Sequence, residues 1–354
     1  MTMAPDRSRG VSFAALVATV QHNCDLGDAQ HARDGALCTY LLAMREMYRW
    51  SAGAPFGAVL ERAAVGGWIA ERESTWDRLC DTAARYRDLP IAGGLDVFDD
   101  RAADAALAGH GLTYAAGIGA FGAPVIFLGE RLREEQREGT TIVIAGTELA
   151  RGLLAPPAAS RDGRVVVRTD ALRRWLWTRF EAGPHRVRTR ADGALIDRFG
   201  ATRAEAIERL VREQTETLVL HELGEVRAAE ILGPDWERML AASEDRQAEA
   251  VLRAVRDLLA DCLVTLPALI DKRAATSLLF WYANLEGVRR ALAPRLVRHH
   301  APFESGEFTA LATLCAEERA AWERTGITLR ERWRAGGATA LRQAARDLLR
   351  NAQS

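Results

Sequence analysis

Residues 217–226 place polar side chains inside an otherwise apolar stretch. His221, Glu222 and Glu225 stand there among leucines and valines. On a helix, His221 and Glu225 are neighbours at a spacing of four, and Glu222 and Glu225 at a spacing of three. Two carboxylates close together in a low dielectric repel each other, and each is costly to bury without a positive partner. We therefore expect an arginine, a shared proton or a metal cation to face them.

A second carboxylate–imidazole pair lies near the N-terminus. Asp28 and His31 are three residues apart at the start of a predicted helix over residues 29–50. Helical bundles build di-metal sites from Glu or Asp and His pairs on facing helices. Oxygen and imidazole ligands together suit iron, manganese or zinc. The pattern predicts a divalent metal held by His221, Glu225, His31 and Asp28.

The chemistry expected of such a site depends on the metal. Two irons would support oxygen-dependent oxidation of a small molecule. One zinc would activate water for hydrolysis, because zinc lowers the pKa of its bound water, and Glu222 would be the catalytic base. The leading hypothesis is thus a metal-dependent oxidoreductase or hydrolase acting on a small molecule. We favour the di-iron form, since carboxylates are many and the motif holds no thiolate.

The same residues also allow structural roles. Asp28 would serve as the N-cap of the helix over 29–50, and the cluster at 221–225 would be an ion-pair network with Arg227 or a distant arginine. The protein would then be a non-catalytic helical interaction protein with a protein partner. A metal-storage or metal-sensing protein is a third alternative. The group that faces Glu222 and Glu225 in the fold discriminates between these classes.

Two motif matches are incomplete. His221 to Glu225 resembles the zincin sequence HExxH, but Glu225 replaces the second histidine, and Ile231 occupies the third-ligand position of the longer metzincin form. A zincin-like hydrolase stays an alternative because a carboxylate can bind zinc. Residues 117–122 match GxGxxG, but a strand-like run follows instead of a helix. This segment predicts a glycine-rich hairpin turn.

The pattern of apolar residues predicts three regions. Residues 1–90 form an N-terminal helical region, 91–170 a mixed α/β subdomain, and 171–354 a C-terminal helical region that joins the first in one body. The predicted fold class is mainly α, a helical bundle with a small inserted antiparallel β subdomain. Individual predictions are a helix from Ser12 to 23, a break at 24–28, strands at 112–115, 124–128, 140–144 and 165–168, a helix at 130–137, and a helix capped by Thr202 and ended by Gly233.

The amino-acid composition further limits the class of protein. The chain has 354 residues, is 48% hydrophobic and 27% charged, and carries a net charge of −1. This balance argues against a basic nucleic-acid arm, and no apolar run reaches the roughly 18 residues needed to span a bilayer. Five cysteines without a CxxC pair suggest reduced thiols in the cytoplasm. The oligomeric state is not encoded in any of these features.

The chain also resembles a bacterial protein family of about this length that is known as a domain of unknown function. The resemblance lies in the HELGE stretch at 221–225, in the CxYLLxMRExYRW stretch at 38–50, and in residues 24–31 and 275–280. It covers nearly the whole chain. It implies one integrated protein and supplies neither a reaction nor a ligand.

Overall fold

The chain divides into two compact units. The computed structural model describes residues 12–34, 36–91, 93–181, 202–243, 245–299 and 308–353. Unit 1 comprises Met1–Glu134, Val143–Pro157 and Arg168–Arg174. Unit 2 comprises Glu135–Ile142, Ala158–Val167 and Trp175–Ser354. Among the described residues, every helix is too short or too polar to cross a bilayer.

Unit 1 begins with four helices. These are α1 (Phe13–His31), α2 (Leu37–Ser51), α3 (Arg62–Asp81) and α4 (Asp100–Ala108). The Ser12 side chain accepts a hydrogen bond from the Ala15 N–H, which confirms the predicted start of the first helix.

The predicted break at 24–28 is wrong, because α1 continues through it. Residues 23–28 are all buried, and the Asn23 side chain hydrogen-bonds both the N–H and the carbonyl of Arg87. Tertiary burial of this segment overrides the weak local helix propensity of Gly27 and the aspartates. Asp28 lies inside α1, so the alternative prediction that it is an N-cap is wrong as well.

A five-stranded sheet follows. Its strands are β1 (Leu112–Ile118), β2 (Pro124–Arg137), β3 (Thr140–Arg151), β4 (Ala158–Arg161) and β5 (Arg164–Arg168), in the order β1-β2-β3-β5-β4. β1 pairs antiparallel with β2, through the predicted glycine-rich hairpin, and β4 pairs antiparallel with β5.

The sheet is mixed and curls into a half-barrel. β2 and β3 are joined by the two-residue turn Glu138–Gly139, in which both residues have positive φ, as a tight antiparallel hairpin requires. With three antiparallel pairs assigned, the remaining pair, β3 with β5, is the parallel one.

The sheet corrects the predicted fold class. We expected a small antiparallel insert in a helical bundle, whereas the sheet is a core element beside sizeable helices. The error came mainly from residues 130–137, which were predicted to be a helix and instead form the second half of β2. Their charges hide the alternation of a strand: the Leu132 residue is 61% exposed, whereas the neighbouring Arg131 side chain is 10% exposed.

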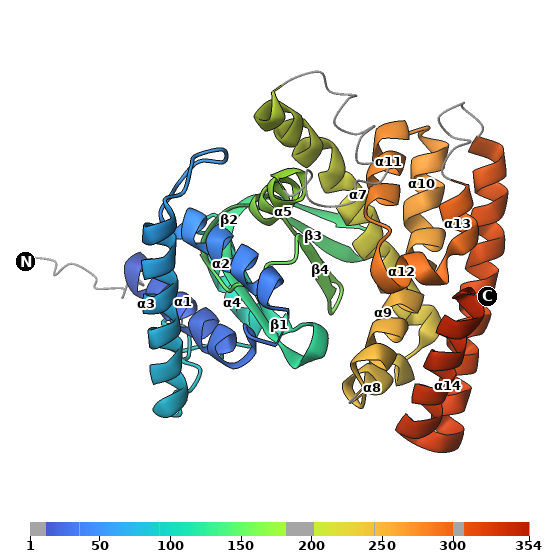
Figure 1. Ribbon diagram of the computed structural model, residues 1–354, viewed down its shortest axis with the longest axis horizontal. Coiled ribbons are helices and arrows are strands. Elements are labelled where there is room, and N and C mark those ends of the chain that lie inside the picture. Colours follow the sequence, from blue (N-terminus) through green and yellow to red (C-terminus); the bar gives the residue numbers. More distant parts are fainter. Residues whose placement is uncertain are drawn as a thin grey trace, which may run out of the picture. The chain divides into compact units, whose positions relative to one another are not determined.

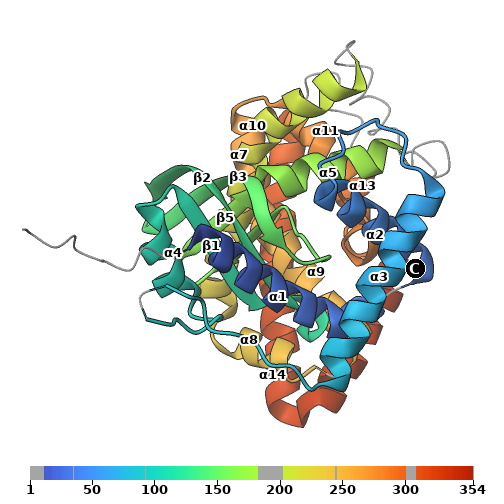
Figure 2. The same cartoon turned by 90° about the vertical axis from the view of Figure 1, so that its left-hand side faces the viewer.

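The core of unit 1 lies between helices and this sheet. Apolar residues of α1 and α4 pack against β1 and β2, and Figure 2 shows α1 crossing these strands. The buried members are Leu16, Val20, Cys24, Leu89, Ile91, Val97, Ala103, Leu107, Leu112, Tyr114, Ala116, Ile126, Leu128 and Ala150. A second cluster joins α2 and α3 around Met44, Met47 and Trp76.

Helices make up most of unit 2. The helix α5 (Thr169–Glu181) enters it, and then come α7 (Arg203–Leu232), α8 (Asp235–Ala241), α9 (Arg246–Ala260), the π-helical turn η2 (Asp261–Thr265), α10 (Leu266–Asp271), α11 (Ala275–Ala283), α12 (Gly287–Leu292), α13 (Pro294–Arg298) and α14 (Phe308–Gln353). A capping box at Thr202 and a positive φ at Gly233 confirm both predicted ends of α7. As Figure 1 shows, α7 and α14 both lie along α9.

Candidate metal centre

The candidate site forms where α7 touches α9. A β-carbon on Gly224 would lie 2.5 Å from the carbonyl oxygen of Ala260. Only glycine permits this approach, because any side chain would collide with the backbone of α9. The contact brings the side chains that precede and follow Gly224 on α7 against those that flank Ala260.

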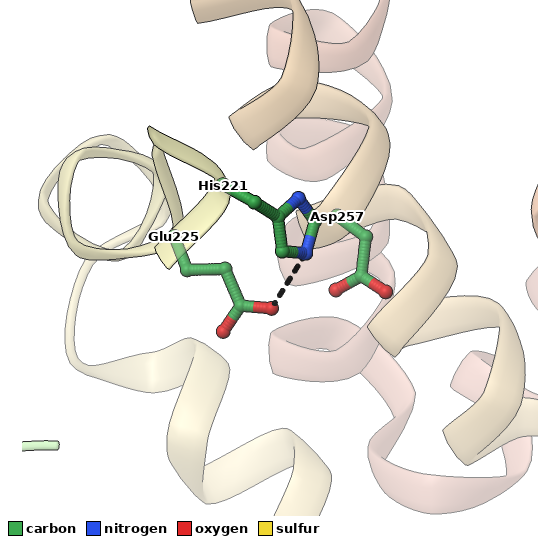
Figure 3. Close-up of side chains that lie close together, drawn as sticks. All are labelled: His221, Glu225 and Asp257. Atoms are coloured by element: carbon green, nitrogen blue, oxygen red, sulfur yellow. Dashed lines mark ion pairs between the residues drawn. The ribbon is translucent and has the colours of Figure 1, made fainter. Parts of the chain in front are cut away.

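Three potential ligands converge beside this contact. His221, Glu225 and Asp257 each offer one ligand atom, and these three atoms lie within 4.8 Å of one another. Among the described residues, this is the one cluster of His, Cys, Asp or Glu side chains close enough to hold a metal ion. His221 Nε2 is 3.5 Å from Glu225 Oε1. Figure 3 shows the two side chains of α7 and the Asp257 side chain of α9 directed toward a common space. Their side chains keep 13–19% exposure, so the space is within reach of solvent.

The other nitrogen of His221 is fixed by Asp261. His221 Nδ1 lies 2.8 Å from Asp261 Oδ1, and the Asp261 side chain is fully buried. Burial works against the charge on Asp261, but Arg289 and His221 outweigh it and lower the pKa of this carboxyl. An ionised Asp261 can only accept, so Nδ1 carries the proton and Nε2 faces Glu225. Asp261 opens η2, a π-helical turn of the kind often found at functional sites.

Two arginines form ion pairs with the carboxylates around His221. Arg256 lies 2.9 Å from Glu225 Oε2, and Arg289 pairs with Asp261. Burial alone would raise the pKa of Glu225, but Arg256 and His221 hold it at about 2. Burial and the nearby Glu225 raise the pKa of Asp257 to about 6. At neutral pH all three carboxylates around His221 are therefore mainly ionised.

Glu222 is buried next to this group. Burial, followed by the charge of Glu225, raises its pKa to about 8. Its Oε2 has no hydrogen-bond partner among the described residues. The Ser160 hydroxyl, from β4, donates to Glu225 Oε2 at 3.4 Å. A buried carboxyl that is protonated near neutral pH can give or take a proton.

The two predicted N-terminal ligands have other partners. Asp28 accepts hydrogen bonds from the Leu153 N–H with both oxygens, at 3.0 and 2.8 Å. His31 Nδ1 lies 3.3 Å from Asp34. Both residues belong to unit 1, whereas His221 and Glu225 belong to unit 2. The group of close ligand atoms includes neither of them.

Asp257 and Asp261 were missed at the sequence level, as were Arg256 and Arg289. The two aspartates are four residues apart, Asp257 in α9 and Asp261 at the start of η2, the same spacing as His221 and Glu225 on α7. This shared spacing of two polar residues by four positions was the available signal.

Two models of one protein family match the chain. The model of the family of unknown function DUF6866, N-terminal domain, matches residues 15–168, and that of its C-terminal domain matches residues 173–352. The chain belongs to this family. No curated protein and no solved structure matches it.

Proposed function

We propose that His221, Glu225 and Asp257 bind one divalent metal ion and that the protein is a metal-dependent enzyme acting on a small molecule. The observation that carries this proposal is the convergence of the three ligand atoms within 4.8 Å. Two ligands bound at about 2.1 Å in tetrahedral geometry are about 3.4 Å apart. The separation of 3.5 Å between His221 Nε2 and Glu225 Oε1 is close to this value.

The surroundings of His221 support the proposal. Histidines that bind metals usually donate their second ring N–H to a carboxylate, which fixes the ring and raises its basicity. Asp261 stands in that position at 2.8 Å, and Arg289 holds Asp261 in turn. The Nε2 atom of His221 is left to face the other two ligands.

One imidazole with two carboxylates suits zinc, manganese or ferrous iron. A bound metal of this kind supplies Lewis acidity and lowers the pKa of coordinated water. In such a reaction, the buried Glu222 would act as the acid or base, because its raised pKa allows it to hold or release a proton at Oε2. A dinuclear di-iron centre would need a second set of ligands beyond these three.

A non-catalytic polar network is the second candidate. With His221 protonated, the cations Arg256, Arg289 and His221 balance the anions Glu225, Asp257 and Asp261 without any metal. Burial lowers the pKa of His221, but Asp261 and Glu225 outweigh it and raise that pKa, which favours the protonated form. In this case the cluster would only join α7 to α9, and the protein would act through a partner.

Elemental analysis separates the two candidates. The protein is purified without a histidine tag and reconstituted in turn with zinc, manganese and ferrous iron. The double variant His221→Ala, Glu225→Ala is prepared in parallel, and Glu213→Ala, an exposed residue of the same helix, serves as the matched control. Circular dichroism verifies that each is folded.

The metal proposal expects close to one metal per chain in the wild type and in Glu213→Ala, and loss of the metal in the double variant. A wild-type protein that retains no metal after reconstitution would favour the structural network.

A further inference from the structure

The C-terminal helix α14 folds back on itself at two glycines. Its backbone leaves the helical conformation at Gly336 and Gly337, and Gly337 has a φ of 61°, which glycine adopts without strain. Figure 1 shows the last part of α14 running back beside the part that precedes the turn. The two parts form an antiparallel helical hairpin within unit 2.

A groove of about 620 Å³ lies between the two halves of this hairpin. Its floor consists of small or aliphatic side chains that are buried or half-buried and recur every four residues: Ala321, Thr325 and Leu329 before the turn, and Ala340, Ala344 and Leu348 after it. Its exposed edges are formed by Arg324, Thr328 and Arg332 before the turn, and by Gln343 and Asn351 after it. Since the lining extends from Ala321 to Arg332, the groove is about three helical turns long, or about 16 Å. We call it the hairpin groove.

The hairpin carries a surplus of positive charge. Residues 321–351 contain seven arginines and three acidic residues, a net charge of +4, in a chain whose total is −1. Asp347, the one acid among the residues that line the groove, forms an ion pair with Arg350. Arg324 and Arg332 form no ion pair or hydrogen bond with any residue that the structure describes. One edge of the hairpin groove therefore offers two uncompensated cations.

The spacing of the lining residues matches what a third helix presents to a pair of helices. Such a helix inserts apolar side chains from every third or fourth position into the floor and places charged side chains along the edges. The small side chains of Ala321, Ala340 and Ala344 leave room for larger ones. Arg324 and Arg332 are eight residues apart, or about 12 Å along the edge, so two acidic residues two turns apart on the third helix would meet both.

The charge of the hairpin groove discriminates between possible occupants. The hairpin of a second copy of this chain would bring the same surplus of arginines against the groove, and the two would repel each other. Nucleic acid would offer phosphates to the arginines but would leave the floor without apolar partners. An acidic helix with one apolar face satisfies both the edge and the floor.

We propose that the hairpin groove binds an acidic amphipathic helix of a partner protein. Leucine or similar side chains of that helix would fill the floor, and its carboxylates would pair with Arg324 and Arg332. The site is separate from the metal proposed at His221, and neither proposal depends on the other.

A synthetic peptide of about 18 residues is the probe, since this length suffices to form a helix in solution. It carries leucine at the positions that face the floor, glutamate at the positions beside them, and a fluorescent label. A matched peptide has lysine in place of every glutamate. Fluorescence anisotropy with the purified protein should show saturable binding of the acidic peptide and much weaker binding of the basic one.

Two variants test whether the peptide binds in the groove. Ala344→Leu fills the floor and should weaken the binding by about tenfold or more. Ala312→Leu, at an exposed position of α14 outside the groove, should leave the binding unchanged.

The second variant combines Arg324→Gln with Arg332→Gln. It should weaken the binding by about tenfold at low salt, because two exposed ion pairs are lost, and by less at high salt, which screens them. Arg319→Gln, at an exposed ion pair with Glu323, is the matched control. This arm decides the matter if Ala344→Leu does not fold, since both arginines are exposed.

Four outcomes would overturn the proposal. The first is a wild-type protein that shows no saturable binding of the acidic peptide, or binds both peptides equally. The second is full affinity of the double arginine variant at low salt. A DNA duplex that displaces the peptide would assign the groove to nucleic acid, and a dimer in sedimentation that Ala344→Leu dissociates would assign it to a second copy of the chain.

Discussion

Gly224 and Ala260 meet backbone to backbone, with a β-carbon on Gly224 falling 2.5 Å from the Ala260 carbonyl oxygen. His221 and Glu225 lie on either side of Gly224, and Asp257 and Asp261 lie on either side of Ala260. One close contact between two helices therefore sets the distances among all four side chains.

Gly224→Ala should destabilise the protein and weaken metal binding together. The added methyl group forces α7 away from α9, and such overpacking costs about 1–3 kcal/mol. Urea unfolding measures the stability, and metal titration the affinity. Gly66→Ala is the control, because Gly66 lies within α3 and a β-carbon there meets nothing within 4 Å. That variant should be up to about 1 kcal/mol more stable than the wild type. A Gly224→Ala protein with full stability would contradict the packing described for α7 and α9.

Asp261→Asn should lower metal affinity without removing a ligand. The amide holds His221 less well than the carboxylate and leaves Arg289 without its anion. Loss of such an orienting partner reduces metal affinity by about 10- to 100-fold. Competition with a metal-binding dye gives the affinity, and Asp271→Asn, an exposed position on α10, is the matched control. Equal affinities of Asp261→Asn and the wild type would exclude an orienting role for Asp261.

Glu148→Gln should destabilise unit 1 strongly and change its response to acid. Removing one partner from a buried ionic group costs about 3–5 kcal/mol. Burial would raise the pKa of Glu148, but Arg168, Arg174 and Arg151 hold it at about 2. The folded pKa is below the ordinary value of 4.5, so this stabilisation is present above pH 4.5 and is lost as the pH falls toward 2. Urea unfolding between pH 3 and 7 should show the gap between wild type and variant narrowing toward pH 3. A gap independent of pH would contradict the low pKa.

The stability of the Asp28→Asn variant relative to the wild type should increase as the pH rises. Burial raises the pKa of Asp28 to about 7 in the folded protein. The folded pKa is above the ordinary value of 3.8, so the stability linked to protonated Asp28 is present below pH 3.8 and is lost as the pH rises through 7. The variant does not titrate there and keeps an acceptor for Leu153. Between pH 5 and 7 its stability relative to wild type should rise by up to about 1.4 kcal/mol per pH unit. Parallel stability curves for the two proteins would rule out titration of Asp28 in this range.

Local features were predictable from the sequence. Thr202 with Glu205, and Gly233, fixed both ends of α7 because a cap is made by residues next to one another in the chain. The spacing of His221 and Glu225 predicted their closeness for the same reason. Asp257 lies 32 positions after Glu225, and no local sequence pattern predicts that α9 meets α7 at Gly224. The closeness of Asp257 to the other two ligands could therefore not be predicted.

The sheet was harder to predict for a related reason. Residues 130–137 carry so many charges that their alternation in burial emerges only once β1 and β3 pair on either side of β2. Helix α1 shows the reverse case, since burial against the strands and the partners of Asn23 and Asp28 keep it helical where the local sequence favours a break.

The division into two units limits when each unit can fold during synthesis. The chain passes from one unit to the other after residues 134, 142, 157, 167 and 174, so neither unit is a single uninterrupted stretch. Glu148 pairs with Arg151, Arg168 and Arg174, and only Arg151 is present before the ribosome has passed residue 168. If unit 1 folded in a nascent chain halted at residue 160, it would bury Glu148 before Arg168 and Arg174 had been translated. Folding of unit 1 must therefore wait until residues 168–174 have been made.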